Sequence, residues 1–245
     1  LIDNRINKLK KGLKKIEKQR DVQSSSRERN NIPMISIVGY TNAGKSTLLK
    51  KLTNSDAYAA DELFATVDSL QRELKIKDVQ EALIISDTVG FIQNLPTTLI
   101  ESFKSTLMVA TNADLLVHVV DAATALPEMH INTVSTILEQ IEAKSNEIMV
   151  FNKIDKIDKA SLNHLQDNYP QALFVSSLKG EGIVELKEKI AVEVYGITSV
   201  NSFKVSPSKL DTIAKFGKIL NVKNESDYLV LELEMREKLI SRLLE

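Results

Sequence analysis

Residues 39–46, GYTNAGKS, have the composition and spacing of a loop that holds phosphate groups. The loop fits the pattern G-x-x-x-x-G-K-S/T, and the flanking sequence predicts a strand before it and a helix after it. Glycines let successive backbone N–H groups point at one phosphate, and the N-terminus of a helix favours an anion. Lys45 is suited to neutralise the β- and γ-phosphates, and the hydroxyl of Ser46 is suited to bind Mg²⁺.

A second loop, DTVG at residues 87–90, follows the apolar run ALIIS. A carboxylate at the carboxyl end of a buried strand can hold Mg²⁺ directly or through water, which assigns Asp87 to the metal. Gly90 lets its amide approach a γ-phosphate, so this loop is expected to sense whether that phosphate is present. The pattern D-x-x-G is short, and its position after the phosphate loop supports the assignment.

The segment FNKID at residues 151–155 predicts a preference for guanine. The carboxylate of Asp155 can accept charge-assisted hydrogen bonds from N1–H and the 2-amino group of guanine. Adenine lacks this pair of donors and would leave the carboxylate unpaired, a penalty that can reach a factor of about 10⁴. We expect Asn152 to tie this segment to the phosphate loop, the stem of Lys153 to lie on the base, and the backbone near Ser177 to donate to the guanine carbonyl.

The elements that must position these loops alternate between short β-branched runs and helical stretches. Several runs are apolar on both faces, as buried parallel strands are, so the chain is predicted to be α/β with a mostly parallel, doubly wound sheet. The short segment at residues 79–81 is expected to turn a hairpin and make one edge pair antiparallel. Strands are predicted at residues 34–39, 72–78, 82–87, 115–121, 147–153 and 172–177, and helices at about residues 45–53, 97–110, 128–143, 159–167 and 182–195.

Residues 1–31 are predicted to form a basic helix followed by a polar linker. Apolar side chains recur there at alternating spacings of four and three, which is the pattern of a coiled-coil seam. Residues 1–30 also contain ten Lys or Arg and four acidic residues, so the rest of the chain carries a net charge of −7. Such a helix can pack its seam on another helix, and its lysines can also contact RNA. The seam residues are Ile2, Ile6, Leu9, Leu13 and Ile16.

After residue 200 the alternation stops, and residues 199–245 are predicted to be a small α+β domain. Helices are expected at residues 206–216 and 236–245, and strands at 217–223 and 228–234. The predicted domains are therefore residues 1–31, 32–198 and 199–245.

The composition excludes several classes of protein. The chain of 245 residues is 43% hydrophobic, has no cysteine for a disulfide or thiolate site, and has no apolar run long enough to cross a membrane. Three dispersed histidines give no transition-metal site: His118 is expected to be packed within a strand, and His130 and His164 to lie at the surface, away from the motifs. The chain begins with Leu1 and not Met, so we expect it to be a piece of a longer protein.

The stretches GYTNAGKST, LFAT, DTVGFI, LLVHVVDA and NKID resemble the HflX family of ribosome-associated GTPases, within the translation-factor-related P-loop class. The resemblance is strongest over residues 32–195, and the lysine-rich helix is similar to the helical linker of that family. It implies GTP hydrolysis with Mg²⁺, binding to the large ribosomal subunit and its RNA, and separation of stalled or idle ribosomes under stress. Family members carry a further N-terminal domain, so this chain is expected to hydrolyse GTP but to split ribosomes poorly.

Mapped by motif, the resemblance implies that Thr66 in LFATVD is the switch threonine that contacts Mg²⁺ and the γ-phosphate. The family continues with a Pro and two Thr, whereas residues 69–71 here are Ser-Leu-Gln. The predicted catalytic residues are Lys45, Thr66 and Gly90, and the predicted metal ligands are Ser46, Thr66 and Asp87. The predicted GTP-binding residues are Gly39, Tyr40, Thr41, Asn42, Ala43, Gly44, Lys45, Ser46, Thr47, Phe64, Ala65, Thr66, Val67, Asp87, Thr88, Val89, Gly90, Asn152, Lys153, Asp155, Ser176, Ser177 and Leu178.

Hydrolysis by the isolated chain is expected to be slow. Phe91 stands where many GTPases have a glutamine that orients the attacking water, and a phenyl ring cannot bond that water. Either a partner such as ribosomal RNA completes the site, which we favour, or Gln93 takes over. The family often has an Arg-Asp pair where this chain has Gln93-Asn94, so any role of that arginine is absent here.

Three functions remain open at this stage. The first is a GTP-hydrolysing ribosome factor, cytoplasmic and expected to be a monomer. The second is a guanine-nucleotide-dependent interaction module with negligible turnover, which Phe91 favours. The third is a GTPase of ribosome assembly or tRNA modification. The particular residues of the stretches GYTNAGKST and DTVGFI argue against it.

Overall fold

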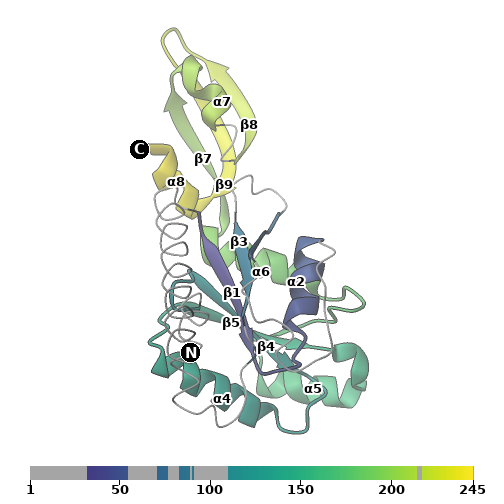
Figure 1. Ribbon diagram of the computed structural model, residues 1–245. Coiled ribbons are helices and arrows are strands. Elements are labelled where there is room, and N and C mark those ends of the chain that lie inside the picture. Colours follow the sequence, from purple (N-terminus) through teal and green to yellow (C-terminus); the bar gives the residue numbers. More distant parts are fainter. Residues whose placement is uncertain are drawn as a thin grey trace, which may run out of the picture. The chain divides into compact units, whose positions relative to one another are not determined.

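The main sheet has six strands in the order β2-β3-β1-β4-β5-β6. Figure 1 labels the strands β1, β3, β4 and β5 of this sheet. The computed structural model describes residues 32–54, 71–76, 83–88, 90, 110–213 and 217–244. All neighbours pair in parallel except β2 and β3, so the predicted antiparallel edge pair is confirmed, and so is the doubly wound α/β class. The strands are β1 (Met34–Gly39), β2 (Gln71–Glu73), β3 (Ile84–Asp87), β4 (Leu115–Asp121), β5 (Asn146–Asn152) and β6 (Leu173–Phe174).

Helices cover both faces of this sheet, and the strand side chains alternate between them. Ile37 of β1 belongs to the apolar cluster that contains Leu48 of α2 and Leu186 of α6, whereas the next residue, Val38, packs with Val134 of α4. A strand buried on both faces has to be apolar at consecutive positions, which explains the run MISIV. The helices are α2 (Lys45–Thr53), α4 (Pro127–Gln140), α5 (Lys159–Asn168) and α6 (Ile183–Tyr195).

The predicted helices at these positions are confirmed to within a few residues at their ends. The helices predicted at residues 1–20 and 97–109 lie outside the described residues, and Ala110 is helical. Among the residues that the structure does describe, no helix has the length and apolar content needed to cross a bilayer.

The C-terminal segment forms a second sheet of three antiparallel strands in the order β7-β9-β8. The strands are β7 (Thr198–Val205), β8 (Gly217–Asn224) and β9 (Leu229–Arg236), and α8 (Glu237–Leu244) follows. The prediction missed β7 because the alternation is inverted in its first half, where Ser199 and Asn201 lie on the half-buried face and Val200 is 54% exposed. Of the predicted helix at 206–216, the structure describes a 3-10 turn (Pro207–Lys209) and α7 (Leu210–Ile213), and residues 214–216 lie outside the description.

Contacts join α6 to the end of β9. The guanidinium of Arg236, only 5% exposed, donates to both carboxylate oxygens of Glu188 at 2.9 Å and to the carbonyl of Gly196 at 3.2 Å. One apolar cluster includes Ile190 and Tyr195 of α6 together with strand β9 residues such as Leu233. The predicted domain boundary at residue 198 stays a prediction. Residues before it, in α6, and after it, in β9, belong to the same hydrophobic cluster.

Candidate nucleotide-binding site

The motif residues meet at the carboxyl end of the parallel sheet. Gly39, Asp87, Asp121 and Asn152 are the last residues of β1, β3, β4 and β5, four strands that are neighbours in the sheet. In open α/β sheets this edge is where ligands bind, because the loops that leave neighbouring strands converge there.

The phosphate loop has backbone angles that require glycine at two places. Gly39 has a φ of 152°, and a Cβ there would lie 2.3 Å from the carbonyl oxygen of Val119. Gly44 has a φ of 89°, and its Cβ would lie 2.4 Å from the side-chain nitrogen of Asn152. The two glycines thus let the loop pass close to β4 and to the end of β5.

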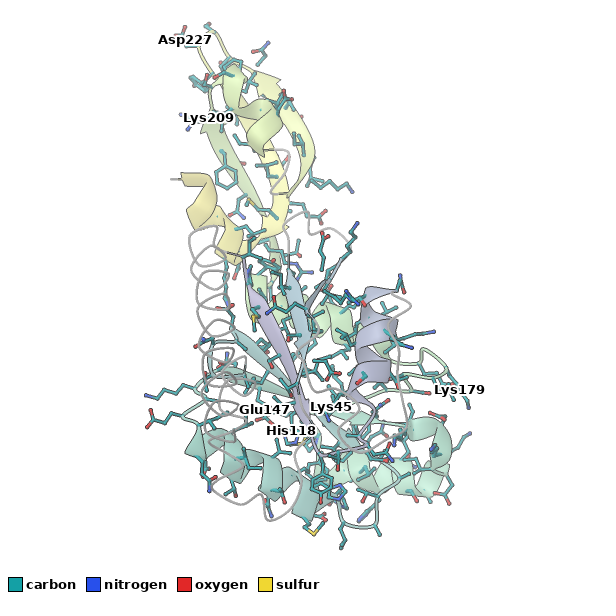
Figure 2. All side chains as sticks on the ribbon, viewed as in Figure 1. Lys45, His118, Glu147, Lys179, Lys209 and Asp227 are labelled. Carbon is teal, nitrogen blue, oxygen red and sulfur yellow. The ribbon has the colours of Figure 1, made fainter. Side chains whose placement is uncertain are left out.

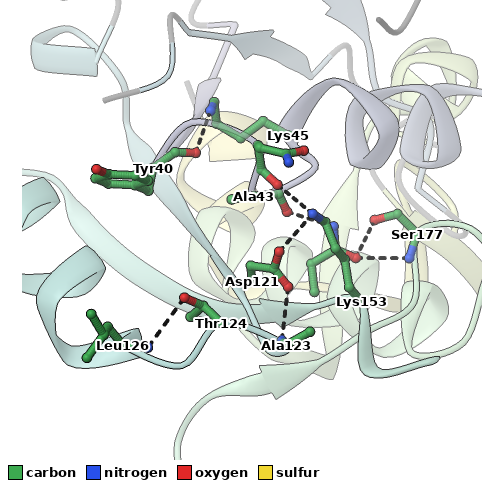
Figure 3. A network of polar contacts seen from close by, with 11 residues as sticks. Tyr40, Ala43, Lys45, Asp121, Ala123, Thr124, Leu126, Lys153 and Ser177 are labelled. Atoms are coloured by element: carbon green, nitrogen blue, oxygen red, sulfur yellow. Dashed lines mark hydrogen bonds and ion pairs between the residues drawn. The ribbon is translucent and has the colours of Figure 1, made fainter. Parts of the chain in front are cut away.

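Side chains hold the carbonyl groups of this loop (Figure 3). Lys45 Nζ donates to the carbonyl of Tyr40 at 3.0 Å. It also donates to the carbonyl of Gly39 at 3.2 Å. Asn152 Nδ2 donates to the carbonyl of Ala43 at 3.0 Å. These bonds fix the loop without using the first N–H groups of α2, which have no acceptor within the helix. No side chain caps this helix at Gly44, so its N-terminus is suited to an anion.

Lys45 is 7% exposed and lies beside the DTVG loop. A Cβ at Gly90 would lie 2.8 Å from Lys45 Nζ, so that glycine lets the two loops approach each other. Burial lowers the pKa of Lys45 to about 8, and the nearby carboxylate of Asp87 opposes part of that shift. Keeping the ammonium of Lys45 charged while it is buried therefore costs free energy, and a bound phosphate would reduce that cost.

Two of the three predicted metal ligands, Ser46 and Asp87, lie within the described residues and contact each other. Ser46 Oγ donates to Asp87 Oδ2 at 2.5 Å, and Asp87 is fully buried. A hydroxyl and a carboxylate fit Mg²⁺, which takes one or two such protein ligands and fills its octahedron with phosphate oxygens and water. No cluster of three or more acidic or histidine side chains that could hold a metal occurs in the part of the chain described. Thr88 points elsewhere: its hydroxyl donates to the carbonyl of Ile37 at 2.7 Å, which leaves only its backbone for a nucleotide.

The base-recognition segments are joined to each other and to the phosphate loop. Asn152 Oδ1 accepts from the amide and the hydroxyl of Ser177, at 3.0 and 2.8 Å, while its Nδ2 bonds the phosphate loop as predicted. Ser176 Oγ donates to Asp155 Oδ1 at 2.5 Å and so orients the carboxylate. The N–H of Ser177, which we expected to face the guanine carbonyl, is thus used by Asn152, and the next residue, Leu178, is 72% exposed.

Asp121 is a site residue that the sequence reasoning missed. Its Oδ2 pairs with Lys153 Nζ at 2.8 Å, and the same ammonium donates to the carbonyl of Asn42 at 2.6 Å (Figure 3). The signal was present, because Asp121 ends an apolar strand as Asp87 and Asn152 do.

The prediction for His130 was wrong. This residue is half-buried on α4, and its ring stacks on that of Tyr40 with centroids 3.9 Å apart and an interplanar angle of 4°. Partial burial lowers the pKa of His130, and the nearby carboxylate of Asp121 opposes the shift. His164 is exposed as expected, and His118 is buried in β4 as expected, with Nδ1 2.8 Å from Glu147 Oε1 (Figure 2).

Some predicted site residues lie outside the described residues. They are the switch segment Phe64, Ala65, Thr66 and Val67, and Val89 of the second loop; Phe91 and Gln93 also lie outside. Their assignments remain predictions. The predicted residues 39–47 are all described and run continuously from β1 into α2.

Comparisons with known proteins agree with this geometry. Residues 34–153 match the family described as 50S ribosome-binding GTPase. The chain is 36% identical over 228 residues to GTPase HflX of Escherichia coli K12, covering 92% of this chain and 53% of that protein. It is 41% identical over 203 residues to GTPase HflX of Caldanaerobacter subterraneus, covering 82% and 46%. The chain thus spans about half the length of the curated relatives it matches.

Among solved structures, the chain is similar to a complex of SsGBP with GDP. The TM-score is 0.53 at 30% sequence identity, with 77% of this chain and 57% of that chain covered. The similarity extends beyond residues 34–153 and supports the arrangement of the sheet and loops given above.

Proposed function

Because the chain belongs to the HflX family of GTPases, we propose that it binds GTP with Mg²⁺ and hydrolyses it to GDP and phosphate in association with the large ribosomal subunit. The observation that carries this proposal is the coupling of two halves of one site. Asp155, oriented by Ser176, offers an acceptor to guanine, and Asn152 bonds the adjoining segment to the phosphate loop.

Nucleotide binding follows from these groups. The remaining carboxylate oxygen of Asp155 accepts from the guanine N–H donors, and adenine would leave it unpaired. The phosphates lie against the N-terminus of α2 and replace the loop carbonyls as partners of Lys45 Nζ. Ser46 and Asp87 would hold Mg²⁺, and that ion would neutralise charge on the β- and γ-phosphates.

In hydrolysis, the water oxygen forms a bond to the γ-phosphorus while the bond from that phosphorus to the bridging oxygen breaks. GDP leaves, and the proton of the water ends on inorganic phosphate. Lys45 stabilises the charge that develops on the phosphoryl oxygens, and the amide of Gly90, adjacent to Lys45 Nζ, is close enough to share that role. Phe91 offers no group to orient the water, so the intrinsic rate is slow and the ribosome supplies the missing contact.

The family description and the HflX relatives support a ribosomal partner. We propose the large subunit and its RNA as that partner, ribosome dissociation or rescue under stress as the purpose, and a cytoplasmic monomer as the active form. The second candidate is a guanine-nucleotide-dependent interaction module, which Phe91 favours because binding would matter more than turnover.

The test is to measure GDP and ADP affinity with Mg²⁺, and then GTP turnover with and without purified large subunits. We expect GDP to bind and ADP to be rejected, and the subunits to accelerate hydrolysis. Subunits that bind the GTP form but leave the rate unchanged would support the interaction module. A preference for adenine nucleotides would contradict both functions.

A further inference from the structure

Through Lys153, Asp121 forms a second link between the base-recognition segment and the phosphate loop, beside the link that Asn152 makes. It is the last residue of β4 and lies in register with Asn152, the last residue of β5. Its Oδ1 accepts from the N–H of Ala123 at 2.9 Å, which fixes the carboxylate in the turn that leaves the strand. Its Oδ2 is then aimed at Lys153 Nζ, 2.8 Å away (Figure 3).

Lys153 needs such a partner to stay where it is. It has a left-handed φ of 67°, which a lysine rarely adopts. Its side chain spans to the carbonyl of Asn42, itself a left-handed residue of the phosphate loop with a φ of 59°. A flexible side chain with an ammonium head loses rotamer freedom in such a contact, and the carboxylate of Asp121 compensates for that loss. Both partners are only partly exposed, at 16% for Lys153 and 22% for Asp121, so water screens the pair less than a surface pair.

A second contact supports the same loop. The ring of His130 stacks on that of Tyr40, two residues before Asn42. The phosphate loop is therefore held at Tyr40 by His130 and at Asn42 by Lys153.

We propose that Asp121 is a positioning residue for the guanine nucleotide: through Lys153 it sets the distance between the loop that holds the phosphates and the segment that reads the base. The inference rests on the proposed function. Asp121 touches neither part of the nucleotide, and its effect is on how long a ligand gripped at both ends stays bound.

The experiment compares D121N with D114N, a matched control. Asp114 immediately precedes β4, is exposed, and accepts one backbone N–H, from Met34 at 2.7 Å, so both variants lose one charge and keep one acceptor at opposite ends of the strand. The dissociation rate of a fluorescent GDP is measured with Mg²⁺, together with the melting temperature without nucleotide. We expect D121N to speed GDP release about tenfold, because loss of a partly buried ion pair acts mainly on the dissociation rate, and D114N to leave it unchanged.

K153Q and the double variant D121N/K153Q distinguish positioning from a general loss of stability. If Asp121 acts through Lys153, the double variant releases GDP at the rate of K153Q alone, whereas multiplying effects would overturn the proposal. An unchanged rate in D121N would also overturn it. If D121N does not fold, D121S keeps a short acceptor for the Ala123 N–H and is held to the same outcomes. Failure of the wild-type chain to bind GDP would instead refute the proposed function.

Discussion

The side-chain amide of Asn152 donates to the carbonyl oxygen of Ala43 at 3.0 Å, although the two residues lie 109 positions apart. The other end of the same amide accepts two hydrogen bonds from Ser177. One side chain, 1% exposed, therefore joins the phosphate loop, the NKID segment and the loop after β6. One buried group therefore holds these three loops together.

Replacing Asn152 by Ala should destabilise the protein even without nucleotide. The substitution leaves a buried carbonyl, an amide and a hydroxyl without their partner. We expect a loss of about 3 kcal/mol in the free energy of unfolding, measured in urea, together with loss of GDP binding. Asn168→Ala is the control, since the side chain of this exposed residue of α5 bonds the exposed His164, and it should change stability by less than about 0.5 kcal/mol. Equal stability of the two variants would contradict the linking role of Asn152.

Asp155→Asn should change which base is bound. The Asn oxygen can still accept from Ser176 Oγ, so the side chain keeps its orientation, and an amide donor replaces the acceptor that faces the base. We expect GDP affinity to fall about a hundredfold or more and xanthosine diphosphate, which has a carbonyl in place of the 2-amino group, to bind better than GDP.

The control for that experiment is Asp158→Asn, three residues further along. Asp158 caps α5 by accepting from the N–H of Ser161, and that bond lowers the pKa of its carboxyl. The Asp158→Asn protein should retain the preference for guanine nucleotides. A D155N protein that still prefers GDP, by equilibrium titration, would remove the basis for assigning guanine.

Much of this site was predictable because its residues occupy the ends of strands. GYTNAGKS, DTVG and NKID each follow an apolar run, and parallel strands bring their carboxyl ends to one edge, so adjacency of the three motifs follows from topology. The missed contacts depend on register and helix rotation instead. Asp121 meets Lys153 only because β4 and β5 pair in one register, and His130 reaches Tyr40 only because α4 turns that face toward the loop.

The C-terminal unit shows a different limit of sequence reasoning. In the first half of β7 a serine and an asparagine are half-buried and a valine is exposed, so the pattern of polarity there predicts no strand. Its pairing partner, β9, alternates regularly and was predicted at residues 228–234. A strand whose hydrogen bonds are satisfied by a strong neighbour needs little apolar surface of its own.

Lys45→Met should give a protein that does not bind GDP and yet is no less stable than the wild type at pH 7. The pKa of Lys45, lowered by burial to about 8, means that holding the ammonium costs about 3 kcal/mol at neutral pH. Loss of its bonds to the carbonyls of Gly39 and Tyr40 offsets about 2 kcal/mol of that gain.

The pH dependence of Lys45 has a definite sign. Between pH 8 and the ordinary lysine value of 10.5, the unfolded chain binds more protons than the folded one at this residue. The free energy of unfolding of the wild type should therefore rise with pH relative to Lys45→Met over that range. Urea unfolding of both proteins at pH 7 and pH 9.5 measures the difference, and a relative fall in the wild type would show that the ammonium is not desolvated.

Gln93→Ala tests which group orients the attacking water. If a ribosomal partner orients the water, the variant should keep the basal GTP turnover within a few-fold of the wild type, since this side chain then contributes little. Steady-state phosphate release without ribosomes is the measurement. A hundredfold loss would assign the water to Gln93 and remove the need for a partner in that step.

Arg236→Met tests whether the C-terminal sheet unfolds with the GTPase core. The side chain is buried against α6, and Met fills its volume but leaves the Gly196 carbonyl unpaired, while Glu188, 59% exposed, returns to water. We expect a loss of about 1–2 kcal/mol in a single urea transition, because α6 and β9 share one apolar cluster. Lys189→Met, which breaks an exposed ion pair with Glu193, is the control and should cost less than about 0.5 kcal/mol. Circular dichroism and amide exchange of β9 should report the same midpoint. Two separate midpoints would instead show that the predicted small domain, residues 199–245, unfolds independently and that Arg236 is only a local contact.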